Sequence, residues 1–273
     1  KDTSGSANDG IYEGPVWLAA SSVLLFSGVV FTNPDNPGQI LKLTPPSTVA
    51  TYLAGAGTNG MAIDGGGAVH ACSHKVQGIV KLDAAGPTLT TLANTIDGKH
   101  FNSPNDLVIR SDGTIYFTDP SYQLGERPSE TGKKGIYRMS PSGAVSLVDD
   151  TFKEPNGITL SPDEAILYVA DYPNNAIRTF AVAADGSTSG RKDFASVRSP
   201  DGFGMDCLGN LYVASGSPGT VEVYSPSAAK LGSVAVAAST SNVAFGGTDG
   251  KTLYITAGKA LYSLDMNLPG YYY

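Results

Sequence analysis

The chain has 273 residues, of which 41% are hydrophobic and only 16% are charged. Its 25 acidic residues outnumber its 18 basic residues, and a net charge of −7 without a basic cluster argues against a nucleic acid as partner. No apolar run reaches the ~20 residues that a membrane-spanning helix needs, so we expect no membrane partner. The 33 Gly and 17 Pro are typical of many short strands joined by tight turns.

Six short segments each begin with a polar, oxygen-bearing residue that is followed by an apolar run. The first residues of these segments are Glu13, Asn59, Asn105, Asn156, Asp201 and Asn242. Successive segments are separated by 46, 46, 51, 45 and 41 residues. A period of roughly 40 to 50 residues without helical patterning is typical of β-propellers. We therefore predict an all-β fold, a six-bladed β-propeller with four-stranded antiparallel blades, in which residues 1–273 form a single domain.

The same order of strands and turns recurs within each interval, and the third interval shows it best. A strand from Asn105 to Ile109 is followed by strands from Thr114 to Thr118, Gly135 to Met139 and Ala144 to Val148. Asp-Gly and Ser-Gly pairs between strands supply the positive φ angles that tight hairpins need. We therefore predict that the acidic residues of these turns shape the backbone and are not ligands. They include Asp64, Asp112, Asp163, Asp206 and Asp249.

Three features lie outside the repeat. Residues 122–134 form a polar insertion, which is either a solvated excursion or a lid or binding loop. Only residues 265–273 follow the third strand of the last repeat, so we expect the first ten residues to complete that blade, with Tyr271 to Tyr273 as the alternative. Cys72 and Cys207 fall in distant repeats, which predicts two buried thiols and no disulfide between them.

The first strand of every propeller blade lines the central channel, so the residues that enter these strands meet at one mouth. Two carboxylates and two amide oxygens would gather there, from Glu13, Asn105, Asn156 and Asp201. Two anions so close repel each other unless a cation separates them or one takes up a proton. Oxygen ligands without Cys or His suit one divalent cation, best Ca²⁺, although Mg²⁺, Mn²⁺ or Zn²⁺ would also be compatible. For Asn59 and Asn242 we prefer the simpler interpretation that they cap turns.

Five motifs follow one another along nearly the whole chain. They are Glu13-Gly14-Pro15-Val16-Trp17, Asn102-Ser103-Pro104-Asn105-Asp106-Leu107-Val108, Asp112-Gly113-Thr114-Ile115-Tyr116-Phe117-Thr118-Asp119-Pro120, Pro155-Asn156-Gly157-Ile158 and Pro200-Asp201-Gly202. In this order they resemble the SMP-30/gluconolactonase family of six-bladed propellers, in particular its bacterial gluconolactonase branch. The resemblance implies that Glu13, Asn156 and Asp201 are metal ligands and that Asp201 is also the general base. It implies that Asn105 is a ligand, or a catalytic substrate contact beside the metal.

Further residues are expected to contact the substrate. Cys72-Ser73-His74 resembles the Cys-x-His element of the bacterial branch, which implies that His74 lies near the pocket. We also expect Asp119 and Tyr122 to contact hydroxyl groups of the substrate. Animal members carry Arg where this chain has Ser103, and the bacterial branch often carries Arg where this chain has His100, which we take as a substrate contact in its place.

The site and the resemblance together predict a metal-dependent lactonase that hydrolyses a sugar lactone such as gluconolactone. The cation would polarise the carbonyl, Asp201 would take a proton from the attacking water, and Asn105 would orient the water or the ring oxygen. One alternative is a phosphotriesterase-like hydrolase that uses the same site, and another is a non-enzymatic propeller that binds proteins at its rim. A strictosidine-synthase-like propeller without metal fits the ligand set poorly. We expect a monomer, located in the cytoplasm or exported after removal of an N-terminal segment.

Overall fold

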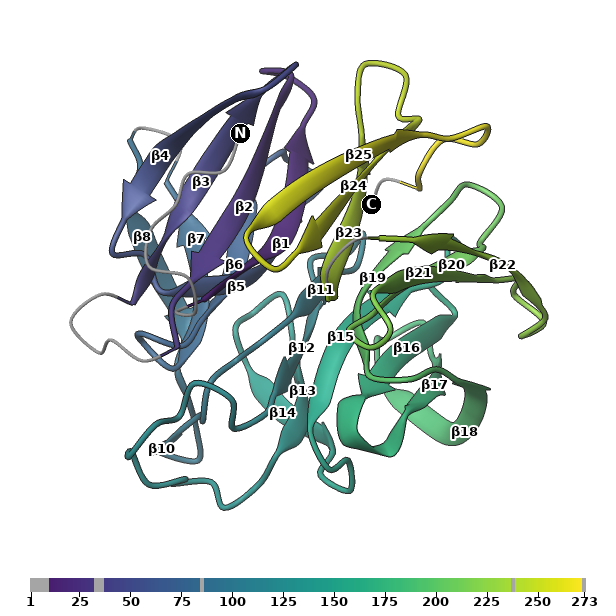
Figure 1. Cartoon of the computed structure of the whole chain (residues 1–273). Helices are drawn as coiled ribbons and strands as arrows, with labels where there is room; N and C mark the ends of the chain where they lie inside the picture. Colours follow the sequence, from purple (N-terminus) through teal and green to yellow (C-terminus); the bar gives the residue numbers. More distant parts are fainter. Residues whose placement is uncertain (1–9, 32–36, 84–85, 237–238, 272–273) are drawn as a thin grey trace.

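Six antiparallel sheets surround a central channel in the computed structural model, which describes residues 10–31, 37–83, 86–236 and 239–271 (Figure 1). The first strands of successive sheets contact one another in the order β1, β5, β11, β15, β19 and β23, and β23 contacts β1 again. This closed ring confirms the predicted six-bladed β-propeller. Among the described residues, no helix is long and apolar enough to cross a membrane.

Strands follow chain order from the channel outward in every blade. The first blade contains β1 (Ile11–Leu18), β2 (Val23–Val29), β3 (Gly38–Thr44) and β4 (Thr48–Ala54). The second contains β5 (Thr58–Ile63), β6 (Val69–Ser73), β7 (Gly78–Leu82) and β8 (Leu89–Ala93). A short hairpin of β9 (Thr95–Ile96) and β10 (Lys99–His100) precedes the third blade. The third blade contains β11 (Leu107–Ile109), β12 (Ile115–Asp119), β13 (Gly135–Met139) and β14 (Val145–Asp149).

The second half of the ring repeats this arrangement. The fourth blade contains β15 (Pro155–Leu160), β16 (Ile166–Asp171), β17 (Ala176–Val182) and β18 (Thr188–Ser196), with the short 3₁₀ helix η1 (Tyr172–Asn174) after β16. The fifth contains β19 (Pro200–Met205), β20 (Leu211–Ser215), β21 (Thr220–Tyr224) and β22 (Lys230–Ala235). The sixth contains β23 (Thr240–Gly246), β24 (Thr252–Ala257) and β25 (Ala260–Asp265).

The sixth blade thus has three strands within the described part of the chain. The segment expected to supply its fourth strand lies, apart from Gly10, outside the described residues. At the seam between the last and first blades, Trp17 stacks on Tyr254 with ring centroids 5.7 Å apart. The other end of the chain packs elsewhere, because the N–H of Tyr271 donates to the carbonyl of Met205 over 2.8 Å. The tail, as far as Tyr271, therefore pairs with the end of β19 and the turn that follows it in the fifth blade.

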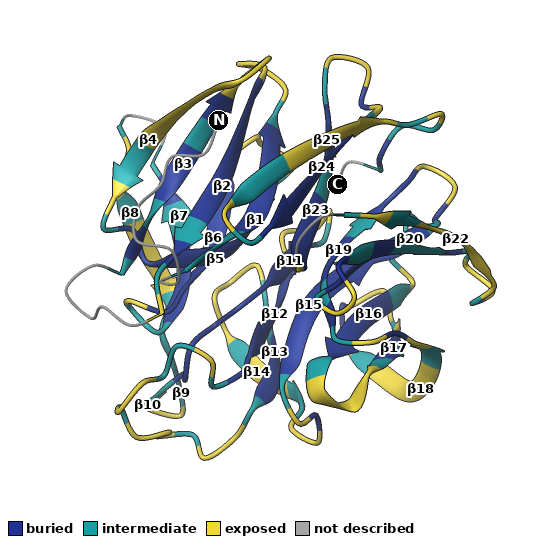
Figure 2. Ribbon diagram, in the orientation of Figure 1, coloured by how far each residue is buried: buried dark blue, intermediate teal, exposed yellow. Residues whose placement is uncertain are grey.

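Apolar side chains of the inner strands pack between neighbouring blades and form the core. Figure 2 shows the inner strands mostly buried and the outer strands largely exposed. All five residues of β20 are buried, for example, whereas most of β22 is exposed. Tyr212 and Val213 of β20 are an aromatic and a β-branched residue, the types of side chain that fill the space between two pleated surfaces well. Each large apolar side chain removed from water in this way contributes about 1.5–3 kcal/mol.

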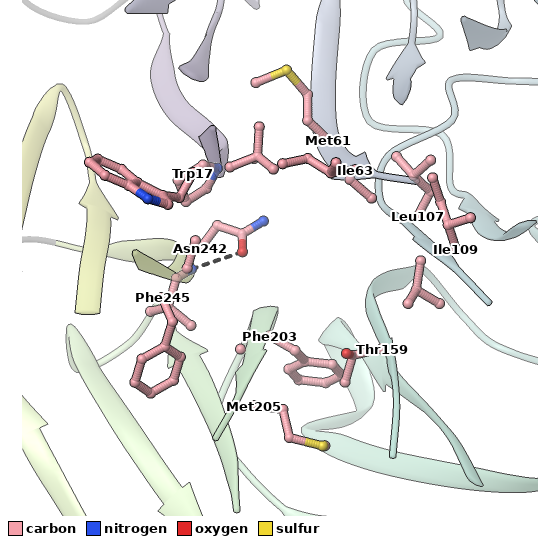
Figure 3. Close-up of a pocket in the computed structure, with 18 of the residues that line it drawn as sticks. Trp17, Met61, Ile63, Leu107, Ile109, Thr159, Phe203, Met205, Asn242 and Phe245 are labelled. Carbon is pink, nitrogen blue, oxygen red and sulfur yellow. Dashed lines mark hydrogen bonds between the residues drawn. The ribbon is translucent and has the colours of Figure 1, made fainter. Parts of the chain in front are cut away.

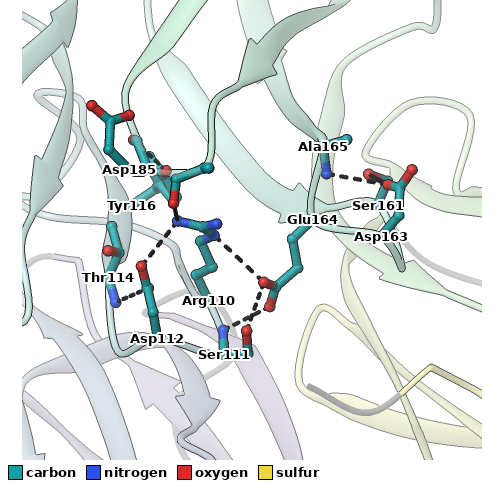
Figure 4. A network of polar contacts seen from close by, with 12 residues as sticks. Arg110, Ser111, Asp112, Thr114, Tyr116, Ser161, Asp163, Glu164, Ala165 and Asp185 are labelled. Carbon is teal, nitrogen blue, oxygen red and sulfur yellow. Dashed lines mark hydrogen bonds and ion pairs between the residues drawn. The ribbon is translucent and has the colours of Figure 1, made fainter.

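Turn aspartates stabilise the hairpins as predicted. Asp112 Oδ1 accepts the N–H of Thr114 over 2.9 Å, and equivalent bonds are formed by Asp64, Asp163, Asp206 and Asp249. The turn with Asp112 is also part of a polar network that joins the third and fourth blades (Figure 4). In this network Arg110 donates to Asp112 over 2.9 Å, and Glu164 accepts both the N–H and the hydroxyl of Ser111.

Both cysteines are free thiols, but only one of them is buried. Cys72 lies in β6, and burial together with the nearby Asp106 and Asp119 raises the pKa of its thiol. Cys207 is exposed, so the prediction that it is buried was wrong. It occupies the turn after β19, where Asp206 shapes the backbone and the side chain is free to face solvent.

Candidate active site

Acidic and amide side chains gather at the mouth of the channel where the inner strands begin. Glu13 comes from β1, Asn156 from β15 and Asp201 from β19. The carboxyls of Glu13 and Asp201 are close enough to interact electrostatically, and the Asn156 side chain hydrogen-bonds to Asp201. The structure thus brings together three of the four predicted ligands. The fourth, Asn105, is buried just before β11, where its N–H donates to Thr118 and its carbonyl accepts the N–H of Gly60.

Glycines that follow these polar residues let the inner strands approach closely. A Cβ on Gly14 would lie 2.2 Å from the Asn59 carbonyl oxygen, and a Cβ on Gly157 would lie 2.0 Å from the Asp201 carbonyl oxygen. Real Cβ atoms do not come so close, so these positions require glycine. The strand pairing also shifts register at this level in β1, β5, β15 and β19. Such bulges turn side chains out of the regular alternation, here at the channel mouth.

The electrostatics of the cluster show an excess of negative groups. Burial raises the pKa of Glu13 to about 7, although hydrogen bonds from Asn242 and from the Gly14 N–H oppose this. Burial raises the pKa of Asp201, and the charges of Glu13 and Asp106 raise it further. The hydrogen bond from Asn156 opposes this increase. Asp106 is a third carboxyl with a raised pKa, caused by burial and by the charge of Glu13. No ion pair between described residues includes any of these three carboxyls.

Whether the residues fit a cation depends on their negative charge and on the oxygen atoms that they offer. Within the described ranges, no group of three or more His, Cys, Asp or Glu side chains is arranged to hold a metal ion. The predicted set contains only two carboxylates, so a cation would need amide oxygens as well. Ca²⁺ accepts such mixed oxygen shells readily. The buried Glu13 carboxyl, the half-buried Asp201 carboxyl and the Asn156 amide, with no counter-charge, therefore fit an oxygen-preferring divalent cation.

Two of the predicted substrate contacts lie around this mouth or support it. Tyr122 is 38% exposed, shares a hydrogen bond with the Asn156 side chain and lies near Asp201. Asp119 is fully buried, and its two oxygens accept the N–H groups of Asn102 and Ser103 over 2.9 and 2.8 Å. Burial raises the pKa of Asp119 to about 7, against these two bonds. Its contacts orient the loop that leads to Asn105.

His74 and His100, which were predicted to contact the substrate, make polar contacts with residues outside the cluster. His74 is buried, and its Nε2 donates to the Pro37 carbonyl over 3.0 Å. Burial lowers the pKa of His74 to about 4, and the charge of Arg127 adds to this, so the ring is neutral near pH 7. The N–H of His100 in β10 donates to Glu130 over 2.8 Å. A substrate contact by either histidine stays a prediction.

Asn242 was interpreted from the sequence as a residue of the fold alone, but it also contacts the cluster. Its Oδ1 accepts its neighbour Val243 N–H over 2.8 Å, which is the capping role expected. Its Nδ2 donates to Glu13 Oε2 over 3.1 Å and holds that carboxyl in place. Asp106 was likewise given no role. Asp106 was detectable, since it follows Asn105 directly, whereas the repeated series to which Asn242 belongs does not separate a capping Asn from one that also contacts the cluster.

Known proteins with a related sequence or structure agree with this arrangement. A family model described as the SMP-30/gluconolactonase/LRE-like region matches residues 11–259. The chain belongs to this family. A gluconolactonase of Zymomonas mobilis is 31% identical over an aligned length of 278 residues, gaps included, and the alignment covers 90% of this chain and 75% of that protein. A lactonohydrolase of Aspergillus oryzae is 33% identical over 184 residues, but only 42% of that protein is matched.

A solved structure extends the SMP-30/gluconolactonase comparison to the fold. It is a gluconolactonase from Xanthomonas campestris, with a TM-score of 0.84 and 33% sequence identity. The match covers 96% of this chain and 87% of that one. The family resemblance stated from the sequence motifs is therefore confirmed.

Proposed function

We propose that this chain is a lactonase that hydrolyses a sugar lactone such as gluconolactone and uses one divalent cation, best Ca²⁺. Glu13, Asn156 and Asp201 would hold the cation, with Asn105 as a further ligand or as a substrate contact. The observation that carries the proposal is the cluster of these carboxyls and Asn156 at the channel mouth. Membership of the family and the gluconolactonases at 31% and 33% identity support it.

The chemistry follows from the positions of the side chains. A bound cation would polarise the lactone carbonyl and offset the charge that develops on its oxygen. Asp201 would accept the proton of the attacking water as general base, which typically contributes about 10²–10⁴-fold to the rate. Asn156, which hydrogen-bonds to the Asp201 side chain, would hold this carboxyl in position. Tyr122, which is exposed beside Asn156, can hydrogen-bond to a hydroxyl group of the sugar.

Asp201→Asn is the direct test of the general base. It keeps the size of the side chain, so the variant is expected to fold and to lose lactone hydrolysis by about 10²–10⁴-fold. Full activity of this variant would refute the assignment of Asp201. Circular dichroism would verify that the variant has kept its fold.

Chelation separates the proposed lactonase from the alternatives. An aldonolactone and an organophosphate triester would each be incubated with the protein before and after dialysis against a chelator, and again after Ca²⁺ is restored. We expect turnover of the lactone alone, lost on chelation and recovered with Ca²⁺. Turnover of the triester instead would favour the phosphotriesterase alternative. Turnover of neither compound by fully metal-loaded protein would favour the protein-binding propeller.

A further inference from the structure

A second concave site lies farther along the central channel. Its cavity of about 560 Å³ is lined by residues that follow the polar cluster in each inner strand, such as Met61, Phe203 and Phe245. None of the four predicted ligands lines it. The inner strands all run along the channel in the same direction, so residues later in these strands lie nearer the opposite mouth. Exposed turn residues Ala20 and Ser21 also border the cavity, which is open to solvent on that side.

The wall of this cavity is apolar. Figure 3 shows residues of the inner strands around the open space, with the rings of Trp17 and Phe245 directed away from it, where they pack on Tyr254 and Tyr212. Small residues create that space, because Gly204 and Ala244 are partly exposed within strands whose neighbouring positions are buried. Larger side chains at these two positions would fill the channel.

Two polar residues that contact Glu13 or its cluster, Asp106 and Asn242, also line the cavity, and both have internal partners. Asp106 Oδ1 accepts the Leu107 N–H over 2.9 Å. Asn242 donates to Glu13 and accepts the Val243 N–H. No Lys, Arg or His is among the residues that line the cavity. An anion would therefore find no counter-charge there, and a charge without a partner in apolar surroundings is costly.

We propose that this cavity is a binding site for a neutral, lipophilic small molecule with an aromatic or alicyclic ring, separate from the lactone site. Pockets of ~300–1,000 Å³ with apolar walls and few polar groups are typical of small-molecule sites. An apolar cavity of about 150 Å³ already holds benzene, so the space here accepts a larger ring system. This proposal is independent of lactone hydrolysis.

The single tryptophan of the chain makes binding measurable, because Trp17 borders the cavity. The probe is N-phenyl-1-naphthylamine, a neutral fluorophore whose emission rises in apolar surroundings. We expect saturable binding of one molecule per chain, with the probe emission rising while the Trp17 emission is quenched by energy transfer. Binding that does not saturate would overturn the proposal.

Cavity-filling variants locate the bound probe. Ala244→Phe and Ala62→Phe each place a ring in the cavity, and we expect them to lower the probe affinity at least about tenfold, the effect of ~1.4 kcal/mol. Ala50→Phe is the matched control, because Ala50 is exposed on β4 in the outer part of the first blade. Equal affinity in the folded filling variants and the control would overturn the proposal. Bromobenzene soaked into wild-type crystals needs no variant: an anomalous bromine peak between Phe203 and Phe245 supports the site, and its absence there contradicts it.

Discussion

Asn242→Ala removes one hydrogen bond that holds Glu13 in place. The bond joins Asn242 Nδ2 to Glu13 Oε2 over 3.1 Å, and both residues are buried. A hydrogen bond to a charged group contributes roughly 1.5–3 kcal/mol. Asn242 would support the cation through Glu13, and loss of such a supporting contact typically weakens metal binding about 10–100-fold. The two ranges agree, so we expect a loss of Ca²⁺ affinity of this size.

Calorimetric titration of Ca²⁺ into metal-free protein measures this effect directly. Asn210→Ala is the matched control, because Asn210 Nδ2 donates to Asp206 Oδ2 over 2.8 Å in a turn away from the site. The control should lose stability but keep its Ca²⁺ affinity. If the Ca²⁺ affinities of the two variants are equal, the positioning role of Asn242 is refuted.

Three further predictions concern stability and the loop. Burial by itself raises the pKa of Asp64, but hydrogen bonds from His70 and from two backbone N–H groups lower the pKa to about 2. The resulting stability is complete above about pH 4 and is lost as the pH falls through 2, so in urea unfolding Asp64→Asn should cost about 1 kcal/mol near neutral pH and only a fraction of that near pH 2. Gly157→Ala forces a Cβ against the backbone and should lower the melting temperature by several degrees, whereas Gly232→Ala, with open space around its Cβ, should not. Arg127 donates to three backbone carbonyls, so Arg127→Ala should speed thermolysin cleavage within residues 122–134, and an unchanged rate would contradict this role.

The sequence was sufficient to predict the ring, because the period of the polar residues requires only counting along the chain. It also predicted that Glu13, Asn156 and Asp201 would lie together, and the structure gathers them; their roles as ligands stay proposals. The second role of Asn242 could not be predicted, because a capping Asn and a supporting Asn look identical in sequence. The cavity was equally hidden. Its width depends on small side chains such as Gly204 and Ala244 meeting across six strands, which no single segment reveals.

Glu13 and Asn242 meet across the seam of the ring, although 229 residues separate them along the chain. Glu13 is synthesised before Asn242, so a chain that stops before the sixth blade has Glu13 without this partner. A cation that binds the finished protein but not incomplete chains adds its binding free energy to the closed ring alone. Metal at this mouth would therefore favour complete molecules over truncated ones, before any substrate arrives.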